Sequence, residues 1–167
     1  QPEVEQTVCF GMNNYFEMSD LVNKTGQYIA RLLQVENAVV VSCASAGIAQ
    51  SIAAVIVRGN PYLLEHLHAK THSIATDIVI PKGHNVNYGA PVGSMVNLGG
   101  GNLIEAGWAN ECSAEQLAAA ITPNTAAILY IKSHHCVQKS MLTVAHAAKV
   151  VDALKVPFFL DSAGEEV

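Results

Sequence analysis

Apolar positions along the chain fall into two patterns, short runs and helical repeats. The short runs are typical of buried strands and lie at residues 38–41, 78–80, 103–105, 126–131 and 156–160. Helical repeats occupy residues 18–33, 47–57 and 92–98, and two further helices begin at the polar caps Ser113 and Thr143. Because strands alternate with helices, the pattern predicts βαβ units, an α/β fold and a mostly parallel sheet.

The composition fits one globular domain or most of one. The chain has 167 residues, of which 50% are hydrophobic and 14% are charged, so it can bury a sizeable core. We expect a helical segment over residues 1–34 that leads into the major α/β domain over residues 35–167. The chain begins at Gln1 and stops at Val167 soon after an expected strand, so we expect the protein to continue beyond both ends.

The charge and the cysteine content limit which kinds of partner and which cellular compartment we expect. The net charge of −5 and the lack of a Lys/Arg cluster argue against a nucleic-acid partner. No apolar run approaches the ~20 residues of a membrane span, and the N-terminus lacks a signal-peptide pattern, so no membrane partner is expected. The scattered cysteines form no CxxC pair and predict a reducing, cytoplasmic compartment: Cys9, Cys43, Cys112 and Cys136.

Two local patterns predict a ligand site. The apolar run at 38–41 continues into small residues and a helix, where backbone amides and the helix dipole can hold a phosphate. The last apolar run ends in Asp161, which places a carboxylate at the sheet edge where α/β proteins bind ligands. Together they predict a phosphorylated cofactor with a cationic ring. Alone, the first pattern also fits an ordinary turn, and Asp161 also fits a strand-end cap.

Four ordered motifs resemble a known family. Residues 43–49, 81–89, 132–139 and 161–166 are similar to the D-glucosaminate-6-phosphate ammonia-lyase and selenocysteine synthase-like group of fold type I enzymes. The resemblance covers the chain from about Phe16 onward. It implies the large cofactor-binding domain of that fold, with three α/β/α layers, pyridoxal 5′-phosphate as cofactor, and a homo-oligomer.

The resemblance also implies which residues hold the cofactor. Ser45, Ala46 and Gly47 match the loop that binds the phosphate. Asp161 matches the aspartate that pairs with the pyridine nitrogen and keeps it protonated.

Three further residues complete the implied cofactor site. Ser162 and Ala163 are small and let the ring lie against the sheet. His84 follows the strand at 78–80 and would stack on the ring or form a hydrogen bond with the substrate, although a surface histidine fits the sequence nearly as well.

Basic residues near the same sheet edge are candidates for binding an anionic substrate. Lys82 follows one expected strand, and Lys132, His134 and His135 follow another. Because neighbouring residues of a strand point to opposite faces, we expect one of the two histidines to reach the pocket. Each lysine alone also fits an ordinary solvated charge.

A metal site is not expected. His66, His68 and His72 lie close in sequence, but no HExxH motif and no Cys pair accompanies them. The chain also lacks the GxSxG and GxxxxGK[ST] motifs of hydrolases and P-loop proteins.

The lysines depart from the family pattern. Fold type I enzymes carry the Schiff-base lysine after the pyridine-binding aspartate, so we expect it beyond Val167 and expect this chain alone to be inactive. All seven lysines precede Asp161: Lys24, Lys70, Lys82, Lys132, Lys139, Lys149 and Lys155.

The reaction implied by the resemblance is an α,β-elimination. The substrate would be a small phosphorylated amino sugar acid such as D-glucosaminate 6-phosphate, and the products 2-keto-3-deoxygluconate 6-phosphate and ammonia. A selenocysteine synthase-like transferase is an alternative, but the negative net charge of the chain argues against tRNA binding. A non-catalytic phosphate-ligand-binding α/β domain is a second alternative, and it predicts cofactor binding without a covalent bond.

Overall fold

The computed structural model describes residues 1–69 and 74–165. The chain divides into two compact units, an N-terminal unit of residues 1–42 and a C-terminal unit of residues 43–167. The division expected near residue 34 stays a prediction. His72 and Lys70, which the sequence analysis named, lie outside the described residues.

The N-terminal unit consists of two helices. Helix α1 (Pro2–Met12) lies within the helical segment expected over residues 1–34, although no apolar repeat marked its ends, and α2 (Met18–Leu33) confirms the predicted helix to the residue. The Glu17 side chain accepts a hydrogen bond from the Ser19 backbone N–H at the start of α2, and Gln34 adopts a left-handed conformation at its end. These local signals define both ends of the helix.

The strand predicted at residues 38–41 is wrong. These residues are irregular, and Val39 and Val40 are 63% and 62% exposed. A strand needs a hydrogen-bonded neighbour, and none of the four described strands pairs with this segment. An apolar run alone therefore did not specify a partner.

The C-terminal unit contains the other predicted elements. The strands confirm the predictions with small shifts and are β1 (Asp77–Pro81), β2 (Asn102–Ala106), β3 (Thr125–Ile131) and β4 (Phe158–Asp161). The predicted helices are confirmed as α3 (Ala44–Val57), α5 (Val92–Leu98), α6 (Ala114–Ala119) and α7 (Val144–Leu154). Three short elements were not predicted: α4 (Pro61–Glu65), η1 (Leu67–Ala69) and η2 (Lys82–His84).

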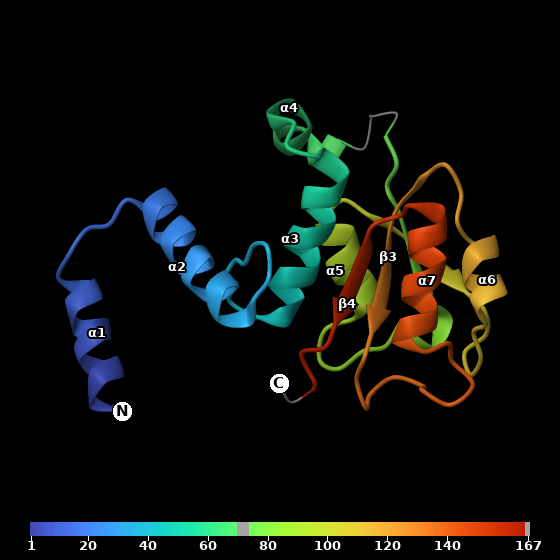
Figure 1. The fold of residues 1–167 in the computed structure, drawn as a ribbon. Helices are drawn as coiled ribbons and strands as arrows, with labels where there is room; N and C mark the ends of the chain where they lie inside the picture. The colour runs from blue at the N-terminus through green and yellow to red at the C-terminus, as the bar shows by residue number, and fades with distance from the viewer. Residues whose placement is uncertain (70–73, 166–167) are drawn as a thin grey trace. The chain divides into compact units, whose positions relative to one another are not determined.

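The four strands form one parallel sheet in the order β2-β1-β3-β4. Figure 1 shows β3 and β4 side by side at one end of this order. Helices α5, α6 and α7 connect successive strands, as parallel neighbours require. The predicted α/β fold is confirmed. All four strands point their carboxyl ends to the same edge of the sheet.

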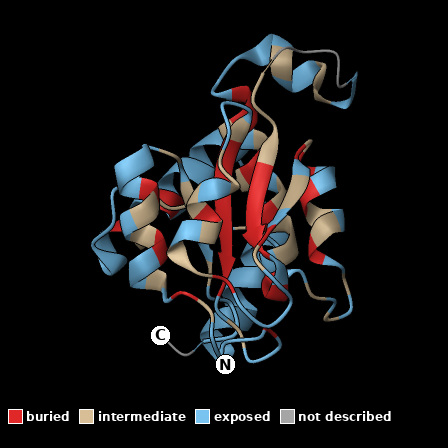
Figure 2. Ribbon diagram, turned by 90° about the vertical axis from the view of Figure 1, so that its right-hand side faces the viewer, coloured by how far each residue is buried: buried red, intermediate tan, exposed pale blue. Residues whose placement is uncertain are grey.

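Two hydrophobic cores lie on the two faces of this sheet. Residues of α3 and α5, such as Ile52 and Val96, share one core with Leu129 of β3. Residues of α6 and α7, such as Leu117, share the other core with Ile128. The alternation along β3 follows the strand period of two, and the buried residues concentrate in the central strands (Figure 2). The predicted three-layer α/β/α arrangement is confirmed.

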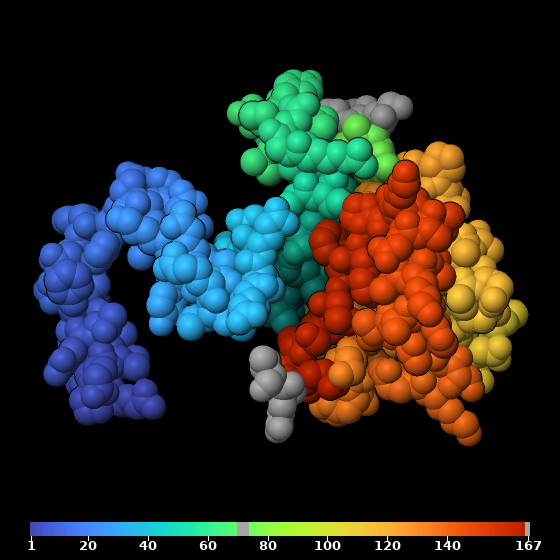
Figure 3. All heavy atoms as spheres, in the orientation of Figure 1, coloured from blue at the N-terminus to red at the C-terminus, as the bar shows by residue number. Residues whose placement is uncertain are grey.

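The outer helices α6 and α7 contact each other and cover one side of the C-terminal unit (Figure 3). Among the described residues, no helix has the length and hydropathy that a membrane crossing requires.

The cap of α6 allows a direct test of local stability. The Ser113 hydroxyl accepts a hydrogen bond from the Gln116 backbone N–H, and the Gln116 side chain accepts one from the Ser113 N–H. We expect Ser113→Ala to lower the free energy of unfolding by about 1 kcal/mol, measured by urea denaturation. The matched control is Ser94→Ala on the exposed side of α5, which should leave stability unchanged or slightly raised. Equal effects of both substitutions would contradict the capping assignment.

Candidate functional site

The carboxyl ends of β3 and β4 position the candidate site. Asp161 is the last residue of β4 and lies opposite Ile131 of β3. The Lys132 backbone N–H donates to the Asp161 carbonyl over 2.8 Å and extends the pairing past the end of β3. The backbone of Asp161 is therefore held on the sheet while its side chain lies at the edge.

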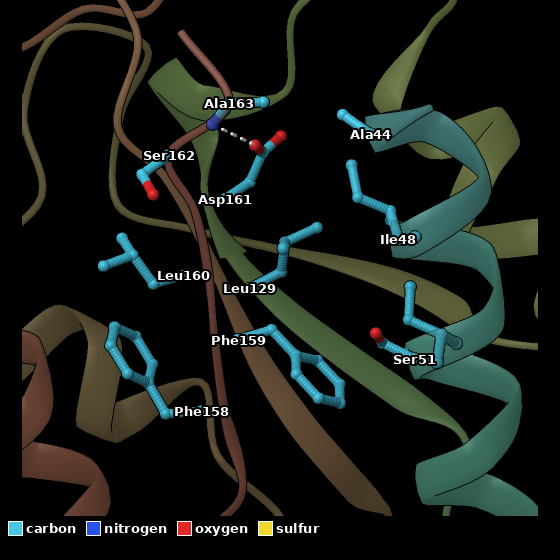
Figure 4. A pocket seen from close by; sticks show the side chains of 12 residues that line it. Ala44, Ile48, Ser51, Leu129, Phe158, Phe159, Leu160, Asp161, Ser162 and Ala163 are labelled. Carbon is cyan, nitrogen blue, oxygen red and sulfur yellow. Dashed lines mark hydrogen bonds between the residues drawn. The ribbon is translucent and has the colours of Figure 1, made fainter. Parts of the chain in front are cut away.

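A first cavity of about 330 Å³ lies between α3 and β4. Its wall consists of residues of α3 between Ala44 and Ile52, Leu129 of β3, and residues 158–163. The side chains of Phe159 and Asp161 point toward α3, whereas Phe158 and Leu160 point to the other side of the strand (Figure 4). The cavity volume is in the range of small-molecule sites.

The N-terminus of α3 opens at this cavity. Cys43 is the N-cap residue, and the Gly47 N–H already donates to the Cys43 carbonyl over 3.0 Å. The amides of residues 44–46 precede the first intrahelical bond, so they are the donors that the helix offers to an anion. Among the three predicted phosphate-loop residues, Gly47 lines the cavity, while Ser45 and Ala46 are half-buried and lie outside its described wall.

A second cavity of about 220 Å³ adjoins the first at Asp161. It shares Ala44, Asp161 and Ala163 with the first cavity. The rest of its wall consists of Tyr88, Ile131, Ser133, His134, His135 and Gly164. Asp161 is thus a common boundary of both cavities. The structure brings together α3, Asp161, Ala163 and both histidines at one sheet edge.

Both histidines line the second cavity, so the expectation that one of them would reach the pocket is wrong. The expectation assumed that they continue the strand, but β3 ends at Ile131 and the histidines lie in the following turn. The alternation of a strand does not apply there. The rings of His134 and His135 are 4.1 Å apart between centroids.

The Asp161 carboxylate forms a structural hydrogen bond, and its negative charge affects the pKa values of two neighbouring side chains. Its Oδ1 accepts a hydrogen bond from the Ala163 N–H over 3.0 Å, which is the strand-end cap considered from the sequence (Figure 4). Burial, with a contribution from the Asp161 charge, raises the pKa of the Cys136 thiol to about 11. The same two causes raise the pKa of Tyr88. Both neighbours therefore stay protonated at neutral pH.

Ser162 and Ala163 follow Asp161 in the wall of the first cavity, as the resemblance implied for small residues. The Ser162 side chain points away from α3 in Figure 4, so its backbone rather than its hydroxyl lies nearest the cavity. Ala163 belongs to both cavities.

His84 is fully buried, which excludes the surface histidine considered from the sequence. Its Nδ1 accepts a hydrogen bond from the Ile131 N–H over 3.4 Å, and its ring is nearly perpendicular to that of Tyr130, with 4.5 Å between the centroids. Burial lowers its pKa to about 4. His84 lies outside the described walls of both cavities. Its stacking on a cofactor ring stays a prediction.

The two candidate lysines lie outside the cavity walls and form ion pairs. Lys82 Nζ lies 3.1 Å from Glu105 Oε2, and Lys132 Nζ lies 2.9 Å from Glu165 Oε2. A hydrogen bond from Asn85, followed by the contact with Lys82, lowers the pKa of Glu105. Because these charges are half-exposed and partnered, a substrate anion would compete with the carboxylates for them. Their role in binding substrate stays a prediction.

Sequence reasoning missed Ala44 and Tyr88 as cavity residues. Ala44 carries no chemistry of its own and lines the cavities as the first residue of α3. Tyr88 lies within one of the four motifs, and an aromatic residue after a buried strand was the available signal. Within residues 1–69 and 74–165, no group of three His, Cys, Asp or Glu side chains could hold a metal ion.

Comparison with known proteins identifies the relatives of this chain. It is 42% identical over 165 residues to the D-glucosaminate-6-phosphate ammonia lyase of Salmonella typhimurium, across 99% of this chain and 44% of that protein. A solved structure of D-glucosaminate-6-phosphate ammonia-lyase matches with a TM-score of 0.92 and 42% identity, across 99% of this chain and 45% of that one. The resemblance to the ammonia-lyase group is confirmed.

A second relative carries a different activity in its name. The chain is 31% identical over 153 residues to a 5′-C-glycyluridine monooxygenase-decarboxylase of a Streptomyces species, across 90% of this chain and 38% of that protein. No family model matches the chain. The chain spans less than half the length of either curated relative.

The buried His84 predicts an acid-sensitive fold. A histidine in the unfolded chain has a pKa near 6.5, so it binds a proton below that pH. In the folded chain His84 binds a proton only when the pH falls to about 4. The contribution of neutral His84 is present above pH 6.5 and is lost as the pH falls toward 4, by roughly 3 kcal/mol. We expect unfolding experiments from pH 7 to 4 to show this loss.

Variants separate His84 from other groups that titrate in the same range. His84→Gln should flatten the pH dependence, whereas His146→Gln on the exposed side of α7 should leave it unchanged. NMR of the wild type supplies a second readout, in which the His84 ring stays neutral at pH 5. A His84 ring that is protonated at pH 6 would contradict the prediction.

Proposed function

We propose that this chain forms the cofactor-binding part of a pyridoxal 5′-phosphate-dependent ammonia-lyase. The reaction is the dehydration and deamination of a phosphorylated amino sugar acid such as D-glucosaminate 6-phosphate, which gives 2-keto-3-deoxygluconate 6-phosphate and ammonia. The similarity to a named ammonia lyase supports the reaction class. The enzyme acts in the cytoplasm as a homo-oligomer.

The observation that carries the proposal is the position of the Asp161 carboxylate. It borders both cavities and shares the first of them with the N-terminus of the 14-residue helix α3. A helix N-terminus attracts phosphate, and a carboxylate pairs with a protonated ring nitrogen. Pyridoxal phosphate carries a phosphate and a ring nitrogen that can be protonated on one flat molecule. The donor set at this edge of the sheet therefore fits this cofactor.

The residues of this chain have distinct roles in the proposed reaction. When bound, pyridoxal phosphate serves as an electron sink for negative charge that forms at the substrate Cα. Asp161 holds the proton on the ring nitrogen, because its negative charge favours the protonated form. The amides of Ser45 and Ala46 at the start of α3 bind the phosphate.

The second cavity supplies groups for the substrate. His134 and His135 lie in its wall and can donate hydrogen bonds to hydroxyl or anionic groups. Neither cavity has a lysine in its described wall. The lysine that the reaction requires is expected from the part of the protein beyond Val167, so this chain is inactive by itself.

Absorption spectroscopy tests whether the cofactor binds. We expect the full-length gene product to develop a visible band with added pyridoxal phosphate, and borohydride to convert it into a covalent lysine adduct beyond Val167. A correctly folded full-length protein without this band would contradict the proposed function. Binding without a covalent adduct would favour the non-catalytic phosphate-binding alternative.

A pair of isosteric substitutions tests Asp161. Asp161→Asn removes the charge that keeps the ring nitrogen protonated, so we expect kcat for ammonia release to fall by roughly 100-fold or more. Asp152→Asn on the exposed side of α7 is the matched control and should keep wild-type kcat. The keto acid product must be identified as well, because one relative of this chain is named as a monooxygenase-decarboxylase and not as an ammonia lyase. Unchanged turnover of Asp161→Asn would refute the assigned role.

A further inference from the structure

Tyr88 is held in place by a tight loop between η2 and α5. The Asn87 side chain accepts a hydrogen bond from the Gly89 N–H over 3.0 Å, and Asn87 and Pro91 form an antiparallel bridge. Gly89 has a φ of +103°, which residues with a side chain rarely adopt. The Tyr88 side chain packs against the core formed by α3 and α5. Backbone and ring are therefore both fixed.

The Tyr88 hydroxyl is buried, and no described residue forms a hydrogen bond with it. Tyr130, the other tyrosine with a buried hydroxyl, donates from that hydroxyl to the Leu142 carbonyl over 3.0 Å. Buried polar groups in folded proteins are nearly always hydrogen-bonded, because an unpaired one costs free energy. The Tyr88 hydroxyl therefore lacks the partner that its burial calls for.

The surroundings of Tyr88 indicate where that partner comes from. Tyr88 lines the second cavity together with Asp161, and its ring centroid lies 6.1 Å from that of His135. Burial and the Asp161 charge raise the pKa of Tyr88, so its hydroxyl keeps its proton. A protonated phenol is a hydrogen-bond donor. The aromatic side chains and the small residues Ala163 and Gly164 of this wall suit a flat ligand that carries oxygen atoms.

We propose that the Tyr88 hydroxyl is a ligand-positioning group that donates a hydrogen bond to an oxygen atom of pyridoxal phosphate, where the cofactor held at Asp161 faces the second cavity. This inference rests on the proposed function and adds a residue to it. Tyr88 would orient the ligand relative to Asp161, which borders the same cavity. The loop at residues 87–91 would then serve to hold this donor in one place.

Two tyrosine-to-phenylalanine variants of the full-length gene product test the inference. For Tyr88→Phe we expect the dissociation constant of pyridoxal phosphate, measured by titration of its absorbance, to rise about 10-fold. The melting temperature without pyridoxal phosphate should stay the same or rise, because the lost hydroxyl has no partner in the protein. Tyr130→Phe removes a hydroxyl that has a protein partner, so it should lower the melting temperature by about 3 °C and leave the dissociation constant unchanged.

The outcomes separate this inference from the proposed function. If the wild type binds pyridoxal phosphate and Tyr88→Phe binds it equally well, the role of Tyr88 is refuted while the proposed function stands. A melting temperature of Tyr88→Phe that falls as far as that of Tyr130→Phe would also refute it, because the hydroxyl would then have a structural partner. If the wild type does not bind pyridoxal phosphate, the proposed function fails and the inference fails with it.

Discussion

The register between β3 and β4 is the constraint on which the candidate site depends. Four consecutive residue pairs join these strands, from Ile128 opposite Phe158 to Ile131 opposite Asp161. A slip of one residue would turn Asp161 to the opposite face of the sheet and bring its neighbour to the cavities. The two cores hold the register, since Phe159 packs on the α3 side and Phe158 on the α7 side. Hydrophobic packing in the middle of β4 thus fixes the carboxylate at its end.

The same packing brings the N-terminus of α3 to this carboxylate. Ile48 and Ile52 of α3 belong to the core that Phe159 also contacts, so the helix lies over the face to which Asp161 points. The cavity between them is lined largely by apolar residues, and its polar features include the start of the helix, the carboxylate and the residues Ser51 and Ser162. In such surroundings an anion at the helix and a cation at the carboxylate are both favoured more strongly than in water. The fold therefore produces a site of two opposite polarities without any cluster of basic residues.

The sequence predicted the parts of the fold that are strongly apolar or clearly capped. β1 and β3 are buried on both faces, and Ser113 and Thr143 mark their helices by side-chain caps. The apolar run at residues 38–41 failed as a strand because apolarity does not specify a hydrogen-bonding partner.

Parts of the site were beyond sequence reasoning for similar reasons. Asp161 could be placed because it ends an apolar run, whereas the exact end of β3, which puts both His134 and His135 at the cavity, depends on pairing with β4. The complete burial of His84 results from packing by distant segments of the chain, which a local sequence pattern does not reveal. Tyr88 likewise acquires its place through a loop and a core that are formed by separate parts of the chain.

The central claim is that Asp161 keeps the ring nitrogen of a bound pyridoxal phosphate protonated. The most direct test is the ¹⁵N chemical shift of the ring nitrogen in labelled pyridoxal phosphate bound to the full-length gene product. The account predicts the shift of a protonated pyridine in the wild type and of a neutral pyridine in Asp161→Ala. A neutral ring nitrogen in the wild type would contradict it.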